Sequence, residues 1–487
     1  MSTRLAAPRM SFFAPSDPRP VHFMGAAGAG MSALAELLAR RGVRVTGCDA
    51  NPATVADLER LGIRVAQGHD AAHVEGARAV VVTSAVPRDH PELEAARAKG
   101  IPVVRRAEAL GEAVSVGEVV AVAGTHGKTT TTVMTTEALA AAGLEPTGIV
   151  GGRVAAWNGN LSAGSDQLFV VEADEYDRSF LALTPTVAVV TSIEADHLDI
   201  YRDLTDIRET FARFASEAHA IVLCADDAGA NALTVPPTAE VVRYGISSTD
   251  ARLVAREVTT EPNGGSAYLP VYDGKVLPRV RLAVPGRHNV LNSLAALGSG
   301  LVLGADAEDL ARGLASFRGV ERRFQRVGEA CGVLVIDDYA HHPTEIRATL
   351  AAARAALPGR RLVAAFQPHL YSRTRDFASQ FGAALALADE IFLTEIYPAR
   401  EQPIDGVSSS LIAEAIALAA RSSVVEPPAS TGSPAPTAGR LAWRGERREL
   451  ATALAGAVRS GDVVITLGAG DITRTGPELL AHLTAAA

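Results

Sequence analysis

A glycine-rich turn that contains one lysine and several threonines joins an apolar segment to a segment of helical character. Residues 121–134 read AVAGTHGKTTTTVM. A turn of this kind points several backbone N–H groups and a helix N-terminus at one place, and such an arrangement binds phosphate. Lys128 adds a mobile positive charge, and the hydroxyl of Thr129 is a ligand type that magnesium accepts. The residues therefore predict a site for the phosphates of a nucleotide.

The match to the common phosphate-loop pattern is incomplete, because Val122 stands where the first glycine would be and the turn opens at Gly124. The alternative is an ordinary helix N-terminus that carries Gly-Lys-Thr by chance. The chain contains only three lysines, Lys99, Lys128 and Lys275. A lysine in this turn is therefore informative, and we favour the phosphate site.

Acidic side chains follow two apolar segments downstream of this turn. The segment LFVVE runs into EADEYD and carries Glu172 at its end, and the next segment runs into EADH, which ends at His197. Parallel strands bring their C-terminal ends to one edge of a sheet, where α/β proteins bind ligands. Carboxylates gathered there repel one another unless a cation or an arginine lies among them, which indicates magnesium. A solvated acidic loop is the alternative, and a second cation at His197 stays open because magnesium rarely binds imidazole.

An earlier glycine turn opens another nucleotide-binding pattern. Residues 21–50 run from an apolar segment through Gly25, Gly28 and Gly30 into a helical segment and then a second strand that ends at Asp49. In a βαβ unit of this kind the turn holds a phosphate and the acid binds a ribose hydroxyl. The glycine spacing is irregular for a dinucleotide. A sugar nucleotide therefore fits as well as NAD.

Apolar segments alternate with helical segments along most of the chain, which predicts an α/β fold with parallel sheets. Residues 240–284 break this alternation and predict a small antiparallel sheet. The α/β pattern restarts near Phe324. Residues 426–439 are rich in Pro, Ser, Thr, Ala and Gly, cannot bury enough apolar area to become ordered, and are interpreted as a mobile surface loop.

Composition excludes several classes of function. At 487 residues the chain is long enough for about three domains. A net charge of −9 without basic clusters excludes nucleic acid as an expected partner. The three cysteines lack metal-type spacing, which indicates a reducing compartment and argues against zinc, and we interpret them as buried small apolar residues. No segment resembles a signal peptide or a membrane span, so we expect a cytoplasmic protein with no membrane partner.

Seven motifs occur in a fixed order along residues 124–374. They are GTHGKTTTT, EADEYDRSFL, TSIEADHLDIY, PGRHNVLNSLAA, RRFQ, DDYAHHPTE and FQPHLYSRT. In this order, and together with the N-terminal string GAAGAGMS, they resemble the Mur ligases of peptidoglycan synthesis. The likeness covers nearly the whole chain, and seven ordered motifs are far more specific than any one of them.

The resemblance implies a three-domain architecture and an activity. A Rossmann-like UDP-sugar-binding domain is expected over residues 1–115, a central ATP-binding domain over 116–323 and a Rossmann-like amino-acid-binding domain over 324–487. The implied enzyme uses ATP and Mg²⁺ to join UDP-N-acetylmuramate to L-alanine through an acyl phosphate, as a monomer or a homodimer. The close alternative is a recycling ligase that joins UDP-N-acetylmuramate to the tripeptide L-Ala-D-Glu-diaminopimelate.

The resemblance also assigns roles residue by residue. The catalytic residues are Lys128, His197, His341 and Arg373. The nucleotide contacts are Gly124, Thr125, His126, Gly127, Lys128, Thr129, Thr130, Asn289, Asn292, Arg323 and Asp338. The substrate contacts are Gly25, Gly28, Gly30, Asp49, Ser84, Tyr339, His341 and Arg373. The metal ligands are Thr129, Glu172 and His197.

Some features depart from the pattern or admit another interpretation. Leu370 stands where the family commonly has arginine, which leaves one anion contact to another residue. No lysine lies between Lys128 and Lys275, so the carbamylated lysine of other ligases in the superfamily is not expected here. A histidine pair before proline also suits a helix cap, which is the alternative role for His341.

Two other classes of function are weaker. An NAD-dependent oxidoreductase built on the first glycine turn would leave the phosphate loop and both acidic strand ends without a task. A regulatory GTPase needs an Asn-Lys-x-Asp string for guanine, and none of the three lysines follows an asparagine.

Overall fold

The computed structural model describes residues 13–51, 55–83, 85–422 and 439–485, which form two compact units. The first unit takes in the described residues up to Glu257, with Tyr268–Val280 and Leu291–Phe317. The second takes in Val258–Ala267, Arg281–Val290 and the described residues from Arg318 onward. Two sequence predictions, the substrate contact Ser84 and nearly all of the loop at 426–439, lie outside the described residues.

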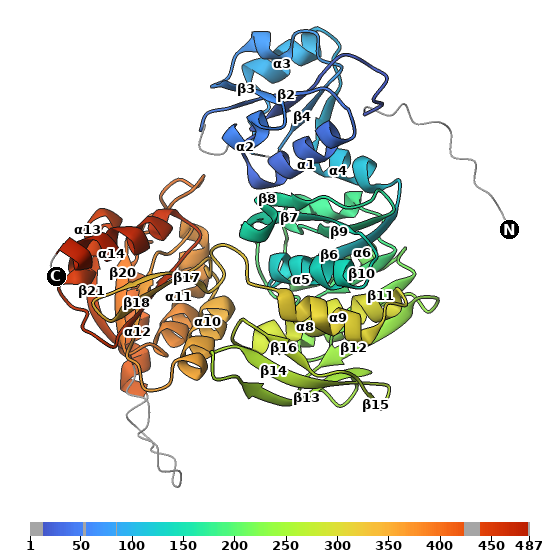
Figure 1. Cartoon of the computed structure of the whole chain (residues 1–487). Coiled ribbons are helices and arrows are strands. Elements are labelled where there is room, and N and C mark those ends of the chain that lie inside the picture. The colour runs from blue at the N-terminus through green and yellow to red at the C-terminus, as the bar shows by residue number, and fades with distance from the viewer. Residues whose placement is uncertain (1–12, 52–54, 84, 423–438, 486–487) are drawn as a thin grey trace. The chain divides into compact units, whose positions relative to one another are not determined.

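The first sheet has five parallel strands in the order β3-β2-β1-β4-β5. Its strands are β1 Val21–Met24, β2 Val45–Asp49, β3 Arg64–Gln67, β4 Ala79–Val82 and β5 Val103–Arg105. Around it lie α1 Ala29–Arg40, α2 Val55–Glu59, η2 Ala71–Val74, α3 Pro91–Ala98 and α4 Arg106–Val114 (Figure 1). Every residue of β1 is buried, as expected for a central strand between two layers of helices. The predicted βαβ unit is therefore present, and its glycine turn follows the middle strand.

The second sheet has eleven strands, with a parallel core in the order β12-β11-β10-β6-β9-β7. These are β6 Glu118–Ala123, β7 Thr147–Val154, β9 Leu168–Glu172, β10 Val187–Val190, β11 Ala220–Cys224 and β12 Glu240–Gly245. The remaining strands are β8 Gly159–Ser162, β13 Leu253–Thr260, β14 Ser266–Tyr272, β15 Lys275–Val276 and β16 Val280–Leu282. Strand β13 is parallel to β12 and β14 is antiparallel to β15, so the strands expected as a small antiparallel sheet extend the central sheet as a mixed region.

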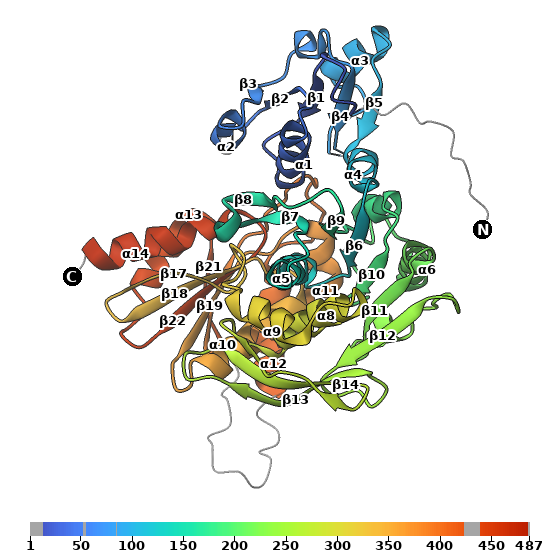
Figure 2. The same ribbon diagram turned by 45° about the vertical axis from the view of Figure 1, so that its right-hand side comes forward.

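The threonine run after the phosphate loop lies in helix α5, Lys128–Ala141. The hydroxyls of Thr132, Thr135 and Thr136 donate to the carbonyl oxygens four residues earlier, at 2.7–2.9 Å. A buried hydroxyl needs a partner, and these bonds let threonine sit inside the fold at the cost of helix propensity. Helix α9, Ala307–Ser316, packs beside α5 where Gly313 meets Ala138 (Figure 2). The hydroxyls of these three threonines are therefore occupied by the backbone of their own helix.

Other helices complete the layers around the second sheet. They are η3 Ala155–Trp157, η4 Tyr176–Ala182, α6 Leu204–Ala215, α7 Ala228–Asn231 and α8 Arg287–Val302.

The third sheet lies in the second unit and has the order β17-β18-β22-β19-β20-β21. All its neighbours are parallel except β17 and β18. The strands are β17 Gln325–Ala330, β18 Val333–Asp338, β19 Leu362–Phe366, β20 Glu390–Thr394, β21 Arg440–Gly445 and β22 Val463–Leu467. The helices are α10 Pro343–Ala356, α11 Tyr371–Leu385, α12 Ser410–Ser422, α13 Arg447–Ala455, η5 Asp471–Arg474 and α14 Thr475–Ala485. The last strand of the chain, β22, is thus inserted in the middle of the sheet.

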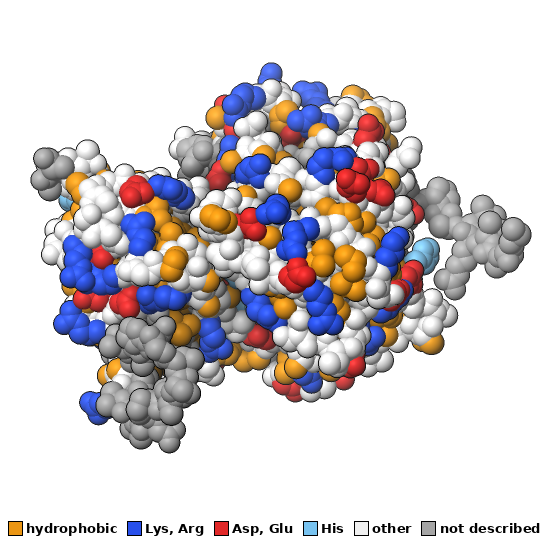
Figure 3. Space-filling model, turned by 60° about the horizontal axis from the view of Figure 1, so that its bottom comes forward, with side chains coloured by type: hydrophobic (Ala, Val, Ile, Leu, Met, Phe, Trp, Pro, Cys, Tyr) orange, Lys and Arg blue, Asp and Glu red, His pale blue; other side chains and the backbone are white. Residues whose placement is uncertain are grey.

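The structure can be compared with the predictions that the three cysteines are buried and that no segment spans a membrane. Cys48 and Cys224 are buried as expected, but the expectation is wrong for Cys331, which is exposed in the turn between β17 and β18. No helix within the described residues combines the length and the hydropathy that a membrane crossing needs. On the face shown in Figure 3, basic side chains are interspersed with acidic ones.

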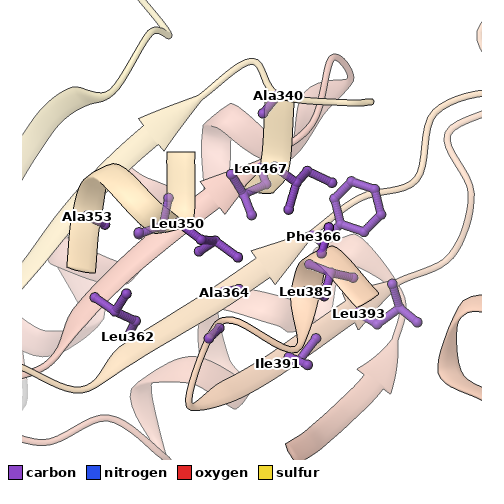
Figure 4. Close-up of a cluster of buried hydrophobic side chains, with 14 of the residues drawn as sticks. Ala340, Leu350, Ala353, Leu362, Ala364, Phe366, Leu385, Ile391, Leu393 and Leu467 are labelled. Atoms are coloured by element: carbon purple, nitrogen blue, oxygen red, sulfur yellow. The ribbon is translucent and has the colours of Figure 1, made fainter. Parts of the chain in front are cut away.

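Side chains of both faces of the third sheet form apolar clusters. One cluster contains Leu385 of α11 and the strand residues Phe366, Ile391 and Leu393 (Figure 4). Leu385 is completely buried. Burial of this kind contributes roughly 1.5–3 kcal/mol for each large apolar side chain. The helix α11 is therefore held on the sheet by its apolar face.

We expect Leu385→Ala to lower the free energy of unfolding of the second unit by about 2–5 kcal/mol. The substitution loses the transfer free energy of the removed apolar atoms and leaves a cavity in which the neighbouring side chains lose contacts. Leu418→Ala in α12 is the matched control, since that side chain is 63% exposed, and it should change stability by less than about 0.5 kcal/mol. Urea unfolding of both variants measures the difference. Equal effects of the two substitutions would contradict this account of the core.

Candidate active site

The phosphate loop connects β6 to α5 and contains two glycines that no other residue can replace without strain. Gly127 has φ 79°, and a Cβ there would lie 2.5 Å from the Oδ1 of Asn292. Gly124 has φ 140°, and a Cβ there would lie 2.0 Å from Thr191 Oγ1. Both φ values lie where L side chains are rarely found. The glycines therefore allow the loop to pass closely between the end of β10 and the helix that carries Asn292.

Backbone and hydroxyl hydrogen bonds hold this loop against the segment after β10. The N–H of Thr125 donates to the Ser192 carbonyl at 2.9 Å, and the N–H of His126 donates to the Ser192 hydroxyl at 3.0 Å. In return, the N–H of Glu194 donates to Thr125 Oγ1 at 2.9 Å. His126 Nε2 lies 3.4 Å from a carboxylate oxygen of Glu194. Four bonds from both sides fix the loop before any ligand arrives.

Lys128 pairs with a carboxylate. Its Nζ donates to the Gly124 carbonyl at 2.7 Å and lies 2.8 Å from the Glu175 carboxylate, which is buried. Burial disfavours both charges, but the charge of Glu175 outweighs it and raises the pKa of Lys128. In the same way Lys128 outweighs burial and lowers the pKa of Glu175. The lysine is therefore held charged at the mouth of the phosphate loop.

The second residue of the helix meets the acidic end of the neighbouring strand. Thr129 Oγ1 donates to Glu172 Oε1 at 2.9 Å, and the other Glu172 oxygen accepts from the N–H of Gly151 at 2.6 Å. A hydroxyl and a carboxylate oxygen at one point are the ligand types that Mg²⁺ prefers. The structure brings these two predicted metal ligands together at the edge of the phosphate loop.

His197 lies beside the carboxylate that pairs with Lys128. Its Nε2 is 3.6 Å from Glu175 and 3.8 Å from Asp196, and its ring meets the ring of Tyr176 edge-on at 5.1 Å. Burial lowers the pKa of this imidazole, but the bond to Glu175 and the charge of Asp196 outweigh burial and raise it. His197 is thus a partner of the carboxylate that binds Lys128, and it lies within the predicted cluster.

The two predicted adenine contacts on α8 differ in their surroundings. Asn292 lies in the first unit against the phosphate loop at Gly127. Asn289 belongs to the second unit, where its Nδ2 donates to the Pro285 carbonyl at 2.7 Å. Thr130, another predicted nucleotide contact, is buried in the first turn of α5. Asn292 therefore joins the cluster that contains Lys128, and Asn289 holds the turn that starts its own helix.

The predicted sugar-nucleotide turn surrounds the N-terminus of α1. Gly25 has φ 75° and donates its N–H to the Cys48 carbonyl at 2.8 Å, and Gly28 is the N-cap of the helix without a side-chain cap. Both oxygens of Asp49 accept backbone N–H groups, from Ala27 at 2.9 Å and from Asn51 at 2.8 Å. The N–H groups at the start of α1 are thus available to an anion, and Asp49 shapes the turn that presents them.

A cavity of about 280 Å³ connects this turn to the acidic end of β9. Gly28, Gly30, Arg106, Glu172 and Asp174 are among the residues that line it. The guanidinium of Arg106 lies beside Gly30 and 3.7 Å from Asp174. Arg106 is not among the residues predicted from the sequence, although Arg-Arg at the end of a short strand is a signal for an anion contact at a strand end. The cavity places a positive charge between two predicted ligand sites.

In the second unit, Asp338 ends β18 and is buried. Its two oxygens accept the N–H groups of Phe324 and Ala340, each at 2.8 Å. Burial raises the pKa of Asp338 to about 6, while the charge of Arg323 acts in the opposite direction. Two of the three predicted nucleotide contacts of this unit, Arg323 and Asp338, are therefore close to each other, and the aspartate holds a turn of backbone.

Aromatic and cationic groups follow Asp338 directly. The guanidinium groups of Arg322 and Arg323 lie 4.9 Å and 5.0 Å from the centre of the Tyr339 ring. The predicted substrate contact Tyr339 and the predicted nucleotide contact Arg323 are thus in direct contact. Arg323 also lies 3.7 Å from Glu345 of α10.

The two adjacent histidines have different roles. His342 is the N-cap of α10, where its Nδ1 accepts the N–H of Thr344 at 3.4 Å. His341 lies before the cap, and its Nδ1 is 3.0 Å from the Tyr339 carbonyl and 3.2 Å from Glu345. The capping alternative therefore applies to His342 and leaves the imidazole of His341 beside Tyr339.

Arg373 lies in the first turn of α11 and is buried, with Nη1 3.5 Å from the Nδ1 of His369. The rings of His369 and His341 lie 5.8 Å apart, so Arg373 and His341 belong to one cluster. Leu370, where the family commonly has arginine, precedes this helix with φ 71°. A leucine in this region is strained, and such strain gathers at functional sites.

These sites define a class of protein, an α/β nucleotide-binding enzyme in which a phosphate loop faces two acidic strand ends. The comparisons with known proteins agree with it. Residues 20–116 match the catalytic domain of the Mur ligase family, residues 122–300 its middle domain and residues 322–470 its glutamate ligase domain. The chain belongs to the Mur ligase family.

Curated relatives resemble the chain over nearly its full length. The UDP-N-acetylmuramate–L-alanine ligase of Kineococcus radiotolerans is 46% identical over 94% of this chain and 95% of its own length. The enzyme of the same name from Rubrobacter xylanophilus is 46% identical over 95% of this chain and all of its own. The crystal structure of the UDP-N-acetylmuramate-alanine ligase MurC of Thermotoga maritima superposes with a TM-score of 0.78 at 28% identity, covering 96% of this chain and all of that one.

We expect Lys128→Ala to lower the free energy of unfolding by about 3 kcal/mol, because it leaves the Glu175 carboxylate buried with His197 as its remaining cationic partner. The double variant Lys128→Ala/Glu175→Gln removes both charges and should recover at least half of that loss. Urea unfolding of the wild type and the variants gives the comparison. If Lys128→Ala had the same free energy of unfolding as the wild type, the pair of Lys128 and Glu175 would contribute nothing to the stability of the fold.

The pKa of Asp338 predicts a dependence of stability on pH. Between its ordinary value of 3.8 and about 6, the folded chain keeps a proton that the unfolded chain has lost. The contribution of this group to stability is therefore lost as pH rises through that window, by about 3 kcal/mol in total. Asp338→Asn cannot titrate, so the free energy of unfolding of the wild type should fall relative to that of the variant by about 2 kcal/mol from pH 4 to pH 6.5. A difference that is constant with pH would contradict the raised pKa.

Proposed function

We propose that this chain is an ATP-dependent ligase that forms an amide bond between UDP-N-acetylmuramate and L-alanine in the synthesis of peptidoglycan precursors. The observation that carries the proposal is the phosphate loop whose Lys128 and Thr129 meet Glu175 and Glu172, in a chain 46% identical to UDP-N-acetylmuramate–L-alanine ligases. ATP, UDP-N-acetylmuramate and L-alanine are its small-molecule partners.

The chemistry requires an activated carboxylate. A carboxylate is a poor acyl donor, so the γ-phosphoryl group of ATP is transferred to the lactyl carboxylate, and ADP leaves. The amine of L-alanine attacks the acyl carbon of this acyl phosphate, the C–O bond to phosphate breaks, and the amine loses a proton to solvent. The products are the amide, ADP and phosphate. The protein accelerates these steps by bringing anions together and neutralising charge.

Lys128 and the loop N–H groups have the first task in this scheme. The loop from Gly124 to Thr130, with Thr125, His126 and Gly127, surrounds the β- and γ-phosphates, and Lys128 exchanges Glu175 for the phosphoryl group that is transferred. Asn292 beside Gly127 binds the adenine with Asn289, and Arg323 and Asp338 make further nucleotide contacts.

The donor set beside the loop fits a magnesium ion. Thr129 Oγ1 and Glu172 Oε1 are 2.9 Å apart and both are hard oxygen ligands. A bound Mg²⁺ supplies positive charge for the phosphate oxygens that become more negative during transfer. The proposed role of His197 at a second cation fits less well, because its Nε2 already faces Glu175 and imidazole is a weak magnesium ligand. His197 instead fixes Glu175 when Lys128 moves to phosphate.

The substrate contacts are assigned to both units. The turn that contains Gly25, Gly28 and Gly30 binds the UDP pyrophosphate through the N–H groups at the start of α1, because the N–H groups of Gly25 and Gly28 already donate within the protein. Asp49 and Ser84 are assigned as further substrate contacts. Arg106 in the adjoining cavity carries the charge that an approaching carboxylate requires. Tyr339, His341 and Arg373 orient the acyl phosphate and the alanine carboxylate. We place the domain boundaries at residues 115 and 323, and the protein in the cytoplasm as a monomer or a homodimer.

The recycling ligase for L-Ala-D-Glu-diaminopimelate is the second candidate. A murein peptide ligase from Psychrobacter arcticus has the same fold, with a TM-score of 0.68 at 24% identity. The alanine ligases, at 42–46% identity, resemble this chain more closely in sequence. We therefore favour L-alanine as the amine substrate.

One assay separates the two candidates. The chain is incubated with ATP, Mg²⁺ and UDP-N-acetylmuramate, and phosphate release is followed with L-alanine or with the tripeptide. We expect release to be at least about 100-fold faster with L-alanine, because the relatives of higher identity bear the name of the L-alanine ligase. The variant Lys128→Ala/Glu175→Gln is the inactive control. Faster release with the tripeptide would overturn the assignment of the amine.

A further inference from the structure

Four side chains with metal-binding groups meet on one face of the first sheet, away from the groups used above. They are His22 of β1, Cys48 of β2, His73 of η2 and Glu92 of α3. One donor atom from each lies within 4.8 Å of all the others. The parallel register places Cys48 beside Met24, two residues after His22, so both strands present these side chains on the same face. Helix α3 covers this face through Leu93 and Ala96, which share an apolar cluster with Cys48 (Figure 1).

The carboxylate of Glu92 is at the centre of this group. It is completely buried, and its Oε2 accepts the thiol of Cys48 at 3.2 Å. Its Oε1 lies 2.8 Å from His73 Nδ1 and accepts the N–H of Asp70 at 3.0 Å. His69 Nδ1 lies 3.3 Å from the Cys48 sulfur. A buried carboxylate is costly without positive charge nearby, and the partners of Glu92 here are a thiol, a backbone N–H group and two imidazoles.

His22 adds an unpaired polar atom to the same site. Its Nδ1 is 3.0 Å from Thr46 Oγ1, the residue directly opposite in the strand register. Its Nε2 is buried and has no hydrogen-bond partner among the described residues. A buried ring nitrogen left unpaired costs free energy that a ligand would recover. When Nδ1 carries the proton and donates it in a hydrogen bond to Thr46 Oγ1, Nε2 has a lone pair that can bind a metal. A metal-bound histidine usually donates its other ring N–H to a neighbouring oxygen in this way.

We propose that His22, Cys48, His73 and Glu92 bind one Zn²⁺ ion. One thiolate, two imidazoles and one carboxylate form a tetrahedral donor set that Zn²⁺ accepts and that the oxygen-seeking Mg²⁺ and Ca²⁺ do not. Zinc bonds of about 2.0–2.3 Å imply separations between donor atoms of about 3.4–3.7 Å, so no pair of donors has to approach by more than roughly 1.4 Å.

Charge and proton balance support this assignment. Binding breaks the S–H bond of Cys48, forms the Zn–S bond and releases one proton to solvent. The two negative ligands, the Cys48 thiolate and the Glu92 carboxylate, then cancel the charge of the ion. A neutral complex is the form that a buried apolar site tolerates best. Asp70 continues to donate its N–H to Glu92, and His69 continues to face the sulfur as outer partners.

The position of the site indicates what the ion stabilises. The carbonyl of Cys48 accepts the N–H groups of Gly25 and Ala26 at 2.8 Å and 3.0 Å, so the ligand residue also holds the first glycine turn. An ion bound by residues of β1, β2, η2 and α3 would hold these four elements together next to the first glycine turn. This consequence rests on the proposed UDP-sugar site, whereas the binding of the ion does not.

Cobalt titration of the full-length protein tests the proposal directly. Protein stripped with a chelator is titrated with Co²⁺ and then with Zn²⁺. We expect one Co²⁺ per chain, tetrahedral visible bands with a thiolate-to-cobalt charge-transfer band, and loss of both when Zn²⁺ displaces cobalt. Cys48→Ser should lose the charge-transfer band and bind Zn²⁺ about 100-fold more weakly or worse. Cys224→Ser is the matched control, because this second buried cysteine lies on β11 outside the cluster, and it should behave like the wild type.

Further variants keep the test decisive if Cys48→Ser does not fold. His73→Ala removes a half-buried ligand and should weaken Zn²⁺ binding about 10-fold or more. Zn²⁺ should raise the thermal unfolding midpoint of the wild type and of Cys224→Ser, and a chelator should reverse the shift. Absence of stoichiometric Co²⁺ binding in the wild type would overturn the proposal. So would unchanged Zn²⁺ affinity in His73→Ala, or a charge-transfer band that is lost only in Cys331→Ser. None of these measurements uses ligase activity, so their failure is distinguishable from failure of the proposed function.

Discussion

The position of β6 between β9 and β10 is the constraint on which the candidate active site depends. Each of the two neighbours pairs with β6 in parallel, so all three strands end at the same edge. The phosphate loop leaves β6 at that edge, Glu172 ends β9, and the segment after β10 holds the loop through Ser192 and Glu194. Without this order the carboxylates would lie on separate parts of the surface, because they are 43 or more residues from the loop in sequence.

A charge balance within the protein follows from this arrangement. Lys128 and the Glu175 carboxylate neutralise each other, and Thr129 satisfies Glu172. Burial makes each of these groups costly when it is alone, so the chain stabilises them by pairing. An incoming phosphate and its cation offer the same two kinds of partner, a negative charge for the lysine and a positive one for the carboxylate. In the proposed function, Lys128 and Glu172 therefore exchange internal partners for external ones, while His197 remains beside Glu175.

The first sheet uses burial in a different way. Its apolar face also contains imidazole, thiol and carboxylate groups, and their hydrogen bonds join strands to η2 and α3. The spacing of the cysteines argued against zinc. The proposed group contains only one cysteine, and its other donors are two histidines and a glutamate distributed over residues 22–92. Only the register of β1 and β2 and the packing of α3 place them around one point. A search for spacing patterns along the chain does not detect such a group, because its members have no fixed spacing.

The sequence by itself determined the local elements and the chemistry of the phosphate loop. Gly124 and Gly127 require a particular backbone, Lys128 and Thr129 predicted phosphate and magnesium as ligands, and alternating apolar segments predicted the α/β class. Tertiary structure decided which strands are neighbours, as when β22 enters the middle of the third sheet, because strand order is set by packing between distant segments. It also decided which side chains meet: Lys128 pairs with Glu175, Arg106 reaches a cavity, and His342 rather than His341 caps α10. Contacts of this kind depend on long-range geometry, and residue type alone carries no information about distance.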